Sequence, residues 1–367
     1  MFSDMVEQDF ENVVFCHDSA TGLRAIIAVH DTTLGPSFGG TRMRAYPSEA
    51  AAVADALALA RGMTYKNAAA GLNVGGGKGV IIGDAATDKS EALLRAYGRF
   101  VHRLGGLFIT AADYGTTPAD VAHMRAETPY AVAIPEDGPR QGSISQATAI
   151  GLMHGTRAAA RHAFGTDDLA GMRVAVQGAG AVGTHVVRLL VDAGAQVTVG
   201  DVDPERLRPL ELLGVKLADD PNRMHELNAE VFCPCAIGGI LTTVTAGELG
   251  APVIVGAANN QLASPEAGMA LHARGVLYAP DFIVNAGGIS YATDRGVDGR
   301  PHAEALGRLA RIAHTTDMVL TTGKLEGVPP YAAAERLAES RLAAVGRARA
   351  LAVPPSAWPP GGMPTLT

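Results

Sequence analysis

The segment Arg173–Gly183 constrains the fold more than any other part of the chain, because a short apolar strand runs directly into the pattern G-x-G-x-x-G. In that pattern Gly178 makes the tight turn, Gly180 lets a pyrophosphate approach the backbone, and Gly183 allows close packing of helix on strand. Asp201 ends the next predicted strand, at the spacing of about 20 residues expected for a carboxylate that binds a ribose diol. Glycines that merely tightened a turn would not require Asp201, so the segment predicts a dinucleotide-binding βαβ unit.

The residues after Asp201 indicate which dinucleotide binds. A carboxylate at this place repels the 2′-phosphate of NADP, and Val202 and Asp203 supply no compensating base. Arg206 is the one cation close by in sequence. We therefore predict NAD as the cofactor.

The region around this unit alternates between strands and helices. Such alternation is typical of βαβ units with a parallel sheet, a doubly wound Rossmann-type domain. The remaining segment, 302–349, is predicted to be mostly helical with a break at 323–330. The five strands predicted for the sheet are Arg173–Gln177, Gln196–Gly200, Glu230–Cys233, Val253–Gly256 and Leu277–Ala279.

The first 150 residues also alternate, which predicts a separate α/β domain. Two apolar runs joined by a polar turn indicate a hairpin of strands, Glu11–Cys16 and Leu23–Val29. Gly35–Gly40 is predicted to be a loop, and Ser48 is predicted to cap a long helix over Glu49–Ala70. Further elements predicted here are a strand at Val80–Gly83, a helix at Ser90–Leu104, a strand at Leu107–Ala111, a hinge or cleft loop at Tyr130–Thr148 and a helix at Ala149–Phe164.

Composition excludes several classes of protein. With 47% apolar and 18% charged residues, the 367-residue chain can form a sizeable core. A formal charge of -7 provides no basic surface for nucleic acid. The chain has neither an apolar run of the ~18 residues that a membrane span needs nor a basic, then apolar, signal peptide at its start. Three cysteines form no disulfide framework, so we expect a cytoplasmic protein that binds neither nucleic acid nor membrane.

Lysine is rare, since only five of the 30 basic residues are lysine, and two of the five, Lys66 and Lys78, lie twelve positions apart. A phosphate-binding loop would need glycine at position 72 and Ser or Thr at position 79, but Leu72 and Gly79 stand there. One ammonium could anchor a substrate carboxylate, and a second, desolvated near other positive charge, could serve as a general base. Asp113 follows a predicted buried strand, where side chains often meet ligands. We prefer this interpretation to two solvated surface lysines.

Together these residues carry a resemblance. From about Val13 to Arg349 the chain resembles the glutamate/leucine/phenylalanine/valine dehydrogenase family, specifically its leucine, valine and phenylalanine dehydrogenase branch. The matching segments occur in order along the chain: Leu34–Met43, Gly62–Gly71, Gly75–Lys78, Asp113–Thr116, the dinucleotide motif, Pro234–Ala236, Gly256–Gln261 and Tyr278–Gly288.

The resemblance implies NAD-dependent, reversible oxidative deamination of an L-amino acid to its 2-oxo acid and ammonia. By the same resemblance Lys66 binds the substrate carboxylate with the Gly39 and Gly40 backbone, Lys78 is the base that activates water, and Asp113 holds the amino group. The residues implied for the substrate side chain are Phe38, Ala111, Ile289 and Ala292, with Asn285 beside them. Those implied for the cofactor are Thr148, Gly178, Gly180, Ala181, Val182, Gly183, Asp201, Val202, Cys235, Ala236, Ala257, Asn259 and Asn285.

The implied organisation is a substrate domain, 1–146, joined by a returning C-terminal helix at about 328–350, with a Rossmann NAD domain, 147–327, between them. Closure of the cleft would exclude water. The Pro-rich segment 353–367 is predicted to be a peripheral tail. Family members are homo-oligomers, so we expect one here.

The chain departs from the family pattern at three places: Ala112 and Tyr114 flank Asp113, Ile144–Gln146 replaces a Pro-rich turn, and Phe38 replaces a leucine. An apolar pocket argues against glutamate, whose second carboxylate would need a cation. We favour valine, leucine or isoleucine as substrate, while aromatic amino acids such as phenylalanine or tryptophan, or imine reduction in a specialised pathway, remain alternatives. An inactive NAD-binding paralogue is disfavoured because Lys66, Lys78 and Asp113 are all present.

Other chemistries find little support in the sequence. Cys233 and Cys235, with His225 as the one histidine nearby, do not supply a zinc ligand set, so no metal is predicted. A hydrolase nucleophile elbow, G-x-S-x-G, is not present. Arg42 and Arg44 are interpreted as a solvated or subunit-facing pair.

Overall fold

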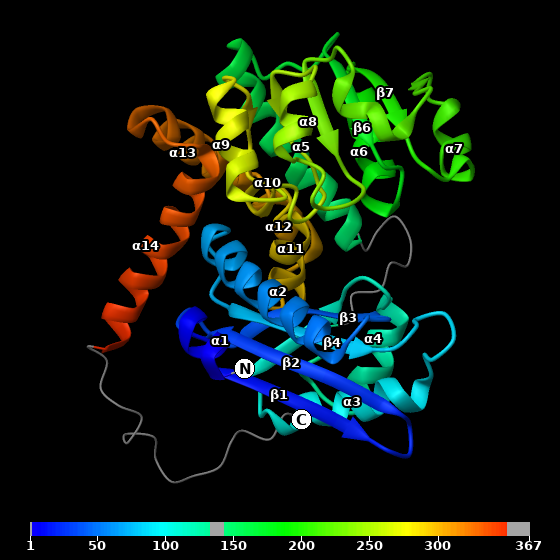
Figure 1. Ribbon diagram of the computed structural model, residues 1–367, viewed down its shortest axis with the longest axis vertical. Helices are drawn as coiled ribbons and strands as arrows, with labels where there is room; N and C mark the ends of the chain where they lie inside the picture. The colour runs from blue at the N-terminus through cyan, green and yellow to red at the C-terminus, as the bar shows by residue number, and fades with distance from the viewer. Residues whose placement is uncertain (1, 133–142, 351–367) are drawn as a thin grey trace.

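The protein is analysed as a computed structural model, and the structure describes residues 2–132 and 143–350. It is built around two β-sheets, one in each half of the chain, with the second stacked above the first in Figure 1. The predicted tail at 353–367 lies outside the described residues, as does the middle of the predicted cleft loop, 133–142.

The first sheet has five strands and mixes antiparallel and parallel pairing. β1 and β2 form the predicted hairpin, β2 pairs antiparallel with β4, and β3 lies between β4 and β5 and is parallel to both. In spatial order the strands are β1 (Asn12–Asp18), β2 (Leu23–Asp31), β4 (Gly75–Ile82), β3 (Ser37–Arg44) and β5 (Phe108–Ala112).

The loop predicted at Gly35–Gly40 is wrong from Ser37 onward, because β3 begins there. Gly39 and Gly40 pair with Thr110 and Ala111 of β5. A Cβ added at Gly39 would overlap the carbonyl oxygen of Gly77, so no larger residue fits between the strands. Glycine has a low intrinsic preference for strands, but here close packing requires it and overrides that preference.

Helices cover both faces of this sheet. Ser48 caps α2 (Glu49–Ala69) as predicted, by accepting a hydrogen bond from the Ala51 N–H. Small residues of α2 pack on one face in a cluster with Ile26, Ala28 and Val80, while Leu94 and Tyr97 of α3 (Glu91–Arg103) pack with Ile27 and Ile81 in another. Two short helices were not predicted, α1 (Phe2–Gln8) and α4 (Pro118–Arg125).

The second sheet has six parallel strands, which confirms the predicted Rossmann-type architecture. The strand order reverses between β6 and β9, and ligands of such sheets bind at the carboxyl ends of the strands at that point. The short strand β8 was not predicted. In spatial order the strands are β11 (Leu277–Tyr278), β10 (Val253–Ile254), β9 (Val231–Pro234), β6 (Arg173–Gln177), β7 (Gln196–Gly200) and β8 (Lys216–Leu217).

Helices connect the strands of this sheet and cover it. The first, α5, begins at Ile144, inside the predicted loop, because Ser143 caps it through the Gln146 N–H. None of the helices within 2–132 and 143–350 combines the length and apolarity needed to span a membrane. The helical elements are α5 (Ile144–Phe164), α6 (Ala181–Asp192), η1 (Pro204–Arg206), α7 (Arg208–Glu211), η2 (Pro221–Glu226), α8 (Thr243–Glu248), α9 (Pro265–Ala273), α10 (Asp281–Val284), α11 (Gly287–Gly296), α12 (His302–Arg308), α13 (Arg311–Glu326) and α14 (Pro330–Ala350).

The last helix, α14, returns from the second half of the molecule to the first (Figure 1). Ala333, Ala334 and Ala338 of α14 are buried in a cluster with Ala68 and Ala69 at the end of α2. Arg341 donates hydrogen bonds from Nη1 to the carbonyl oxygens of Ala68 (3.2 Å), inside the last turn of α2, and of Leu72 (2.6 Å), just beyond that helix. The end of α2 is therefore held by the C-terminal segment.

Candidate active site

A cavity of about 620 Å³ lies between the two halves of the molecule and is lined by residues of both. Lys66, Lys78 and Asp113 line it from the first half, and Asn259 and Asn285 line it from the second. The structure thus brings together, in one cavity, the three residues that the sequence singled out for chemistry.

Lys78 and Asp113 form an ion pair in the wall of this cavity. Lys78 lies on β4 and is 4% exposed, and Asp113 follows the last residue of β5 directly. Lys78 Nζ is 3.0 Å from Asp113 Oδ2. Because β3 separates β4 from β5, the glycines of β3 let these two side chains meet across it.

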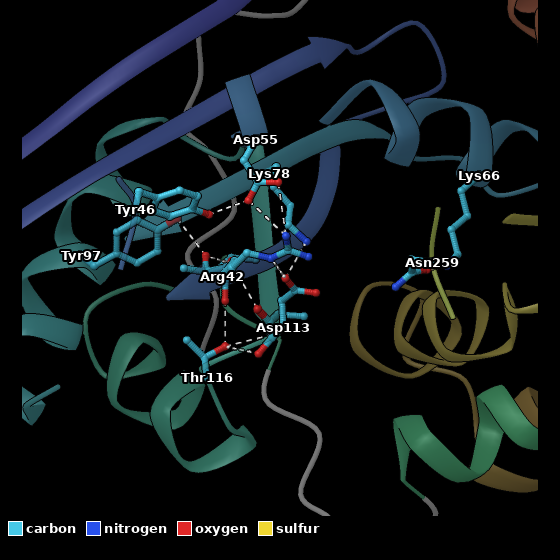
Figure 2. A network of polar contacts seen from close by, with 12 residues as sticks. Arg42, Tyr46, Asp55, Lys66, Lys78, Tyr97, Asp113, Thr116 and Asn259 are labelled. Carbon is cyan, nitrogen blue, oxygen red and sulfur yellow. Dashed lines mark hydrogen bonds and ion pairs between the residues drawn. The ribbon is translucent and has the colours of Figure 1, made fainter. Parts of the chain in front are cut away.

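Arg42 corrects the prediction of a solvated or subunit-facing pair. Its Nε donates to Asp113 Oδ2 at 2.9 Å, its Nη1 lies 3.1 Å from Asp55 Oδ2, and it lines the cavity (Figure 2). Arg44, by contrast, is exposed. The prediction was wrong because both carboxylate partners come from other segments of the chain, so no local pattern shows the pairing.

Lys78 and Arg42 determine the charge of Asp113. Burial alone would raise the pKa of this carboxyl, but Lys78 and Arg42 together lower the pKa to about 2. Both cations contact Oδ2, and Oδ1 accepts no hydrogen bond from the residues within 2–132 and 143–350. Asp113 is therefore an anion with one oxygen left for a ligand.

Lys66 lies in the last turn of α2 and faces the second half of the molecule. Its Nζ donates to Asn259 Oδ1 at 3.3 Å (Figure 2). Burial and the nearby charge of Lys78 lower the pKa of Lys66 to about 8, against the opposing effect of Asp281 and Asp113. Lys66 is therefore a cation at neutral pH, and it loses its charge within an accessible pH range.

Asp281, the first residue of α10, was not singled out as a site residue. Its Oδ2 accepts from the Gln261 N–H at 3.2 Å and its Oδ1 accepts from the Phe282 N–H at 2.9 Å, and it lines the cavity near Lys66. Burial raises its pKa, while the Gln261 N–H and Lys66 oppose that rise. The only signal in the sequence was its place in the segment Tyr278–Gly288.

Two polar side chains from the second half are oriented by the backbone around them. Asn285 donates from Nδ2 to the Ala257 carbonyl (3.1 Å) and to Asn259 Oδ1 (3.0 Å), and its buried Oδ1 has no partner among the described residues. Thr148 also lines the cavity, where its hydroxyl donates to the Ile144 carbonyl at 2.8 Å. The unpaired oxygen of Asn285 requires a donor from a bound ligand or water.

The apolar part of the wall includes Ala111, Ile289 and Ala292, as expected. Phe38 does not line the cavity, contrary to expectation. It is fully buried in one cluster with these three residues, so it can shape the cavity only through them. Because the side chains of Ala111 and Ala292 are small, the cavity has space for a ligand side chain beside them.

The glycine-rich turn after β6 has the backbone that a dinucleotide requires. Gly178 has φ +102°, and a Cβ there would lie 2.9 Å from Ala236, the residue that follows Cys235 after β9. No side chain caps the N-terminus of α6, so its first-turn N–H groups are available to an anion. Gly180, Ala181 and Arg206 line a second hollow beside this turn, with a volume of about 620 Å³.

The remaining predicted cofactor residues surround this turn. Val182 and Ala257 line the main cavity, while Gly183 packs so tightly that a Cβ there would overlap the Gly178 carbonyl oxygen and approach Cys235. Asp201 accepts from the N–H groups of Ala179 (2.7 Å) and Asp203 (2.9 Å), and its side chain is 6% exposed. Val202 beside it is exposed. The carboxylate of Asp201 thus fixes the glycine turn to the end of β7.

Fold and site together define a class: a dinucleotide-dependent oxidoreductase whose paired lysines and aspartate lie in the cleft between a Rossmann-type half and a second α/β half. Two family models match the chain, "Glu/Leu/Phe/Val dehydrogenase, dimerisation domain" at residues 10–130 and "Glutamate/Leucine/Phenylalanine/Valine dehydrogenase" at residues 142–204 and 210–295. The chain belongs to this family of amino-acid dehydrogenases, oxidoreductases that act on a CH–NH₂ group.

Similar proteins cover almost the whole chain. Leucine dehydrogenase of Geobacillus stearothermophilus is 47% identical over 350 residues, which are 95% of each chain. Valine dehydrogenase of Streptomyces albus is 46% identical over 336 residues, 91% of this chain and 92% of that one. Among solved structures, L-tryptophan dehydrogenase from Nostoc punctiforme is 41% identical, with a TM-score of 0.80, and the match covers 94% of this chain and 99% of that one.

Proposed function

We propose that this enzyme catalyses the reversible, NAD-dependent oxidative deamination of an apolar L-amino acid, giving the 2-oxo acid, ammonia and NADH. One observation carries the proposal: a cation for a carboxylate, a carboxylate for an amine and a lysine base line a single cavity with an apolar wall. The leucine and valine dehydrogenases that this chain resembles favour the same reaction.

We also propose that each half of the molecule forms one functional domain. Residues 1–146, with the returning helix at about 328–350, form the substrate domain, and 147–327 form the NAD domain. The packing of α14 on the end of α2 supports this division, because it places the C-terminal segment beside the helix that carries Lys66.

The substrate is proposed to bind through its two charged groups. The ammonium of Lys66 binds the carboxylate together with the backbone of Gly39 and Gly40, and the free Oδ1 of Asp113 accepts a hydrogen bond from the amino group. The apolar side chain then lies against Ala111, Ile289 and Ala292. These contacts present the Cα–H bond to the second half of the molecule.

The chemistry divides into hydride transfer and hydrolysis. The substrate reacts as the free amine. NAD, when bound, would supply the acceptor for the hydride, and loss of this hydride from Cα leaves the substrate as an iminium. Lys78, in its neutral form, takes a proton from water as that water adds to the iminium carbon. The proton on Lys78 then passes through Asp113 to the amine nitrogen. Lys78 takes the hydroxyl proton as the C–N bond breaks, and ammonia leaves as the 2-oxo acid forms. Burial of Lys78 keeps other water away from the base.

The described residues fit NAD. The uncapped N-terminus of α6 would bind the pyrophosphate, Asp201 the ribose, and Thr148, Asn259 and the unpaired oxygen of Asn285 the nicotinamide side. Arg206 is a cation close to Asp201 that could attract a 2′-phosphate, but it pairs with Asp203 (3.3 Å) and lies 3.9 Å from Asp201. We therefore favour NAD over NADP.

The preferred substrates are proposed to be valine, leucine and isoleucine. A specific observation also supports an aromatic alternative: the wall residues Ala111 and Ala292 are both small, and a similar solved structure is an L-tryptophan dehydrogenase. Glutamate is not expected, because its second carboxylate would lie against apolar groups.

A panel assay tests the reaction and the pocket together. Purified enzyme with NAD is mixed with each of L-valine, L-leucine, L-isoleucine, L-phenylalanine, L-tryptophan and L-glutamate, and NADH formation is followed by absorbance. We expect a clear rate with the branched aliphatic group and none with glutamate. Rates only with the aromatic pair would establish the alternative pocket, and no rate with any amino acid by a protein that still binds NAD would refute the proposed reaction.

Binding of the 2-oxo acid is expected to weaken above about pH 8. Lys66 is charged below its pKa and neutral above it, so the dissociation constant of 4-methyl-2-oxopentanoate on the enzyme–NADH complex should rise about tenfold per pH unit beyond that point. The measurement omits ammonia, so only binding is observed.

The control for this pH effect is Lys66→Arg, whose guanidinium stays charged throughout. Its dissociation constant should be independent of pH, even if its absolute affinity is lower. A wild-type constant that does not change between neutral and strongly alkaline pH would show that Lys66 is not the carboxylate anchor.

We further propose that the enzyme is a cytoplasmic homo-oligomer. The description of the family model that matches residues 10–130 names a dimerisation domain, which supports self-association through the first half of the chain. Size-exclusion chromatography with light scattering tests this directly.

A further inference from the structure

The guanidinium of Arg42 lies between two carboxylates that belong to different elements. Its Nε contacts Asp113 at the end of β5, and its Nη1 contacts Asp55 on α2 (Figure 2). Burial opposes the charge of Arg42, but the carboxylates of Asp113 and Asp55 raise its pKa. Arg42 is therefore a fixed positive charge at every pH at which the enzyme is folded.

The second carboxylate is itself held in place. The hydroxyl of Tyr46, just beyond β3, donates to Asp55 Oδ2 at 2.5 Å. Burial and Asp55 raise the pKa of Tyr46, so this hydroxyl keeps its proton and remains a donor. A continuous series of contacts therefore runs Tyr46, Asp55, Arg42, Asp113, and it ends at the cavity.

Asp113 is shared between a permanent cation and a cation that must change charge. Lys78 Nζ and Arg42 Nε lie 3.0 Å and 2.9 Å from the same oxygen, Oδ2. The proposed reaction requires Lys78 to be neutral when it takes a proton from water. At that moment Arg42 is the only one of the two that still neutralises Asp113. The other charged residues that line the cavity are Arg61 and Lys66 of α2, Asp281 of α10 and Glu335 of α14.

We propose that Arg42, anchored by Asp55 and Tyr46, is a positioning residue that keeps Asp113 ionised and its Oδ1 directed at the substrate amine while Lys78 changes charge. The inference rests on the proposed function, because it assigns Arg42 a task within that reaction.

A purely structural role would predict something different. If Arg42 only ties α2 to the first sheet, its loss lowers the unfolding temperature and reduces the rate equally at every pH. If it positions Asp113 and keeps that carboxylate ionised, its loss changes the pH dependence itself, because Arg42 lowers the pKa of Asp113. The pH profile therefore separates the two roles.

The test compares Arg42→Gln with wild type in the direction of deamination. Glutamine keeps a hydrogen-bond donor and removes the charge. We expect kcat/KM at its plateau to fall by about 10²-fold. The acidic limb of its pH profile should move about one unit to higher pH, because Asp113 then loses one of the two cations that lower its pKa. Arg42→Lys, which keeps the charge without the forked contacts, should restore the position of the limb but only part of the rate.

A second readout does not depend on activity. The pH dependence of carbodiimide coupling of Asp113 to an amine, which requires the protonated carboxyl, is measured by mass spectrometry, with the exposed Glu211 and Asp219 as internal references in the same chain. In Arg42→Gln the coupling of Asp113 should persist to a higher pH by about one unit, because Arg42 no longer lowers the pKa of this carboxyl, while the references stay unchanged. Should the wild type lack turnover with every amino acid, the proposed function fails but this measurement still decides the role of Arg42.

Two further variants complete the design. Tyr46→Phe changes no charge and should lower kcat severalfold without moving the acidic limb, because it loosens the anchor alone. Arg24→Gln removes one exposed arginine from β2 of the same sheet, away from the cavity, and should leave rate and profile unchanged. An unchanged pH dependence of Asp113 coupling and an unchanged acidic limb in a folded Arg42→Gln would overturn the proposal.

Discussion

Lys78→Ala is expected to lower kcat by roughly 10²–10⁴-fold, the loss typical when a general base is removed. Lys78 is buried against Asp113, and no other lysine of the cavity contacts that carboxylate. The affinity for NAD should remain as in wild type, because Lys78 lies on β4 of the first half and the glycine turn lies in the second. Steady-state kinetics and NAD titration by fluorescence together measure the two quantities.

The matched control is Lys324→Ala, which removes an exposed lysine at the end of α13. It should leave kcat, KM and NAD affinity unchanged. Thermal unfolding of Lys78→Ala should remain cooperative, since Arg42 still pairs with Asp113. Turnover at the wild-type rate in Lys78→Ala would remove the base from the mechanism.

Gly76→Ala is expected to have the largest effect on stability. A Cβ at this position of β4 would overlap the backbone N–H and the hydroxyl of Thr64 on α2, and a helix backbone cannot shift to make room cheaply. We expect a destabilisation of about 3 kcal/mol, seen as a fall of roughly 5–10 °C in the midpoint of thermal unfolding. Displacement of α2 also moves Lys66 and Asp55, so kcat/KM should fall as well.

Gly307→Ala provides the comparison, because Gly307 is an exposed residue of helix α12 and a Cβ there would meet nothing within 4 Å. That substitution should be neutral or stabilising by about 0.5–1 kcal/mol. If both alanines gave the same unfolding midpoint, close packing of α2 on β4 would not explain the glycines of this strand.

The Rossmann half could be predicted from sequence because its signals are local. The glycine turn, the strand before it and Asp201 lie within 29 residues of one another, and the parallel sheet follows from alternation alone. The long helix α2 could be predicted equally well, because Ser48 marks its start and the spacing of its apolar residues marks its length.

The first half was harder to predict, for two physical reasons. β3 contains adjacent glycines, so neither propensity nor alternation identifies it as a strand, and only its fit between β4 and β5 explains it. Arg42 was misassigned because its partner Asp113 is 71 residues away. The pairing of a charge across a sheet depends on strand order, which the sequence pattern does not reveal.

The return of α14 to α2 has a practical consequence for making chimeric enzymes. Because α14 packs on the end of α2, a single fusion at position 146 that exchanges the Rossmann-type half with that of a relative would also replace the helix that contacts α2. The donor segment has to be inserted between two junctions, one before α5 and one between α13 and α14. A hybrid made with one junction would carry a foreign last helix against its own Ala68 and Ala69, and its solubility would report how well that helix fits.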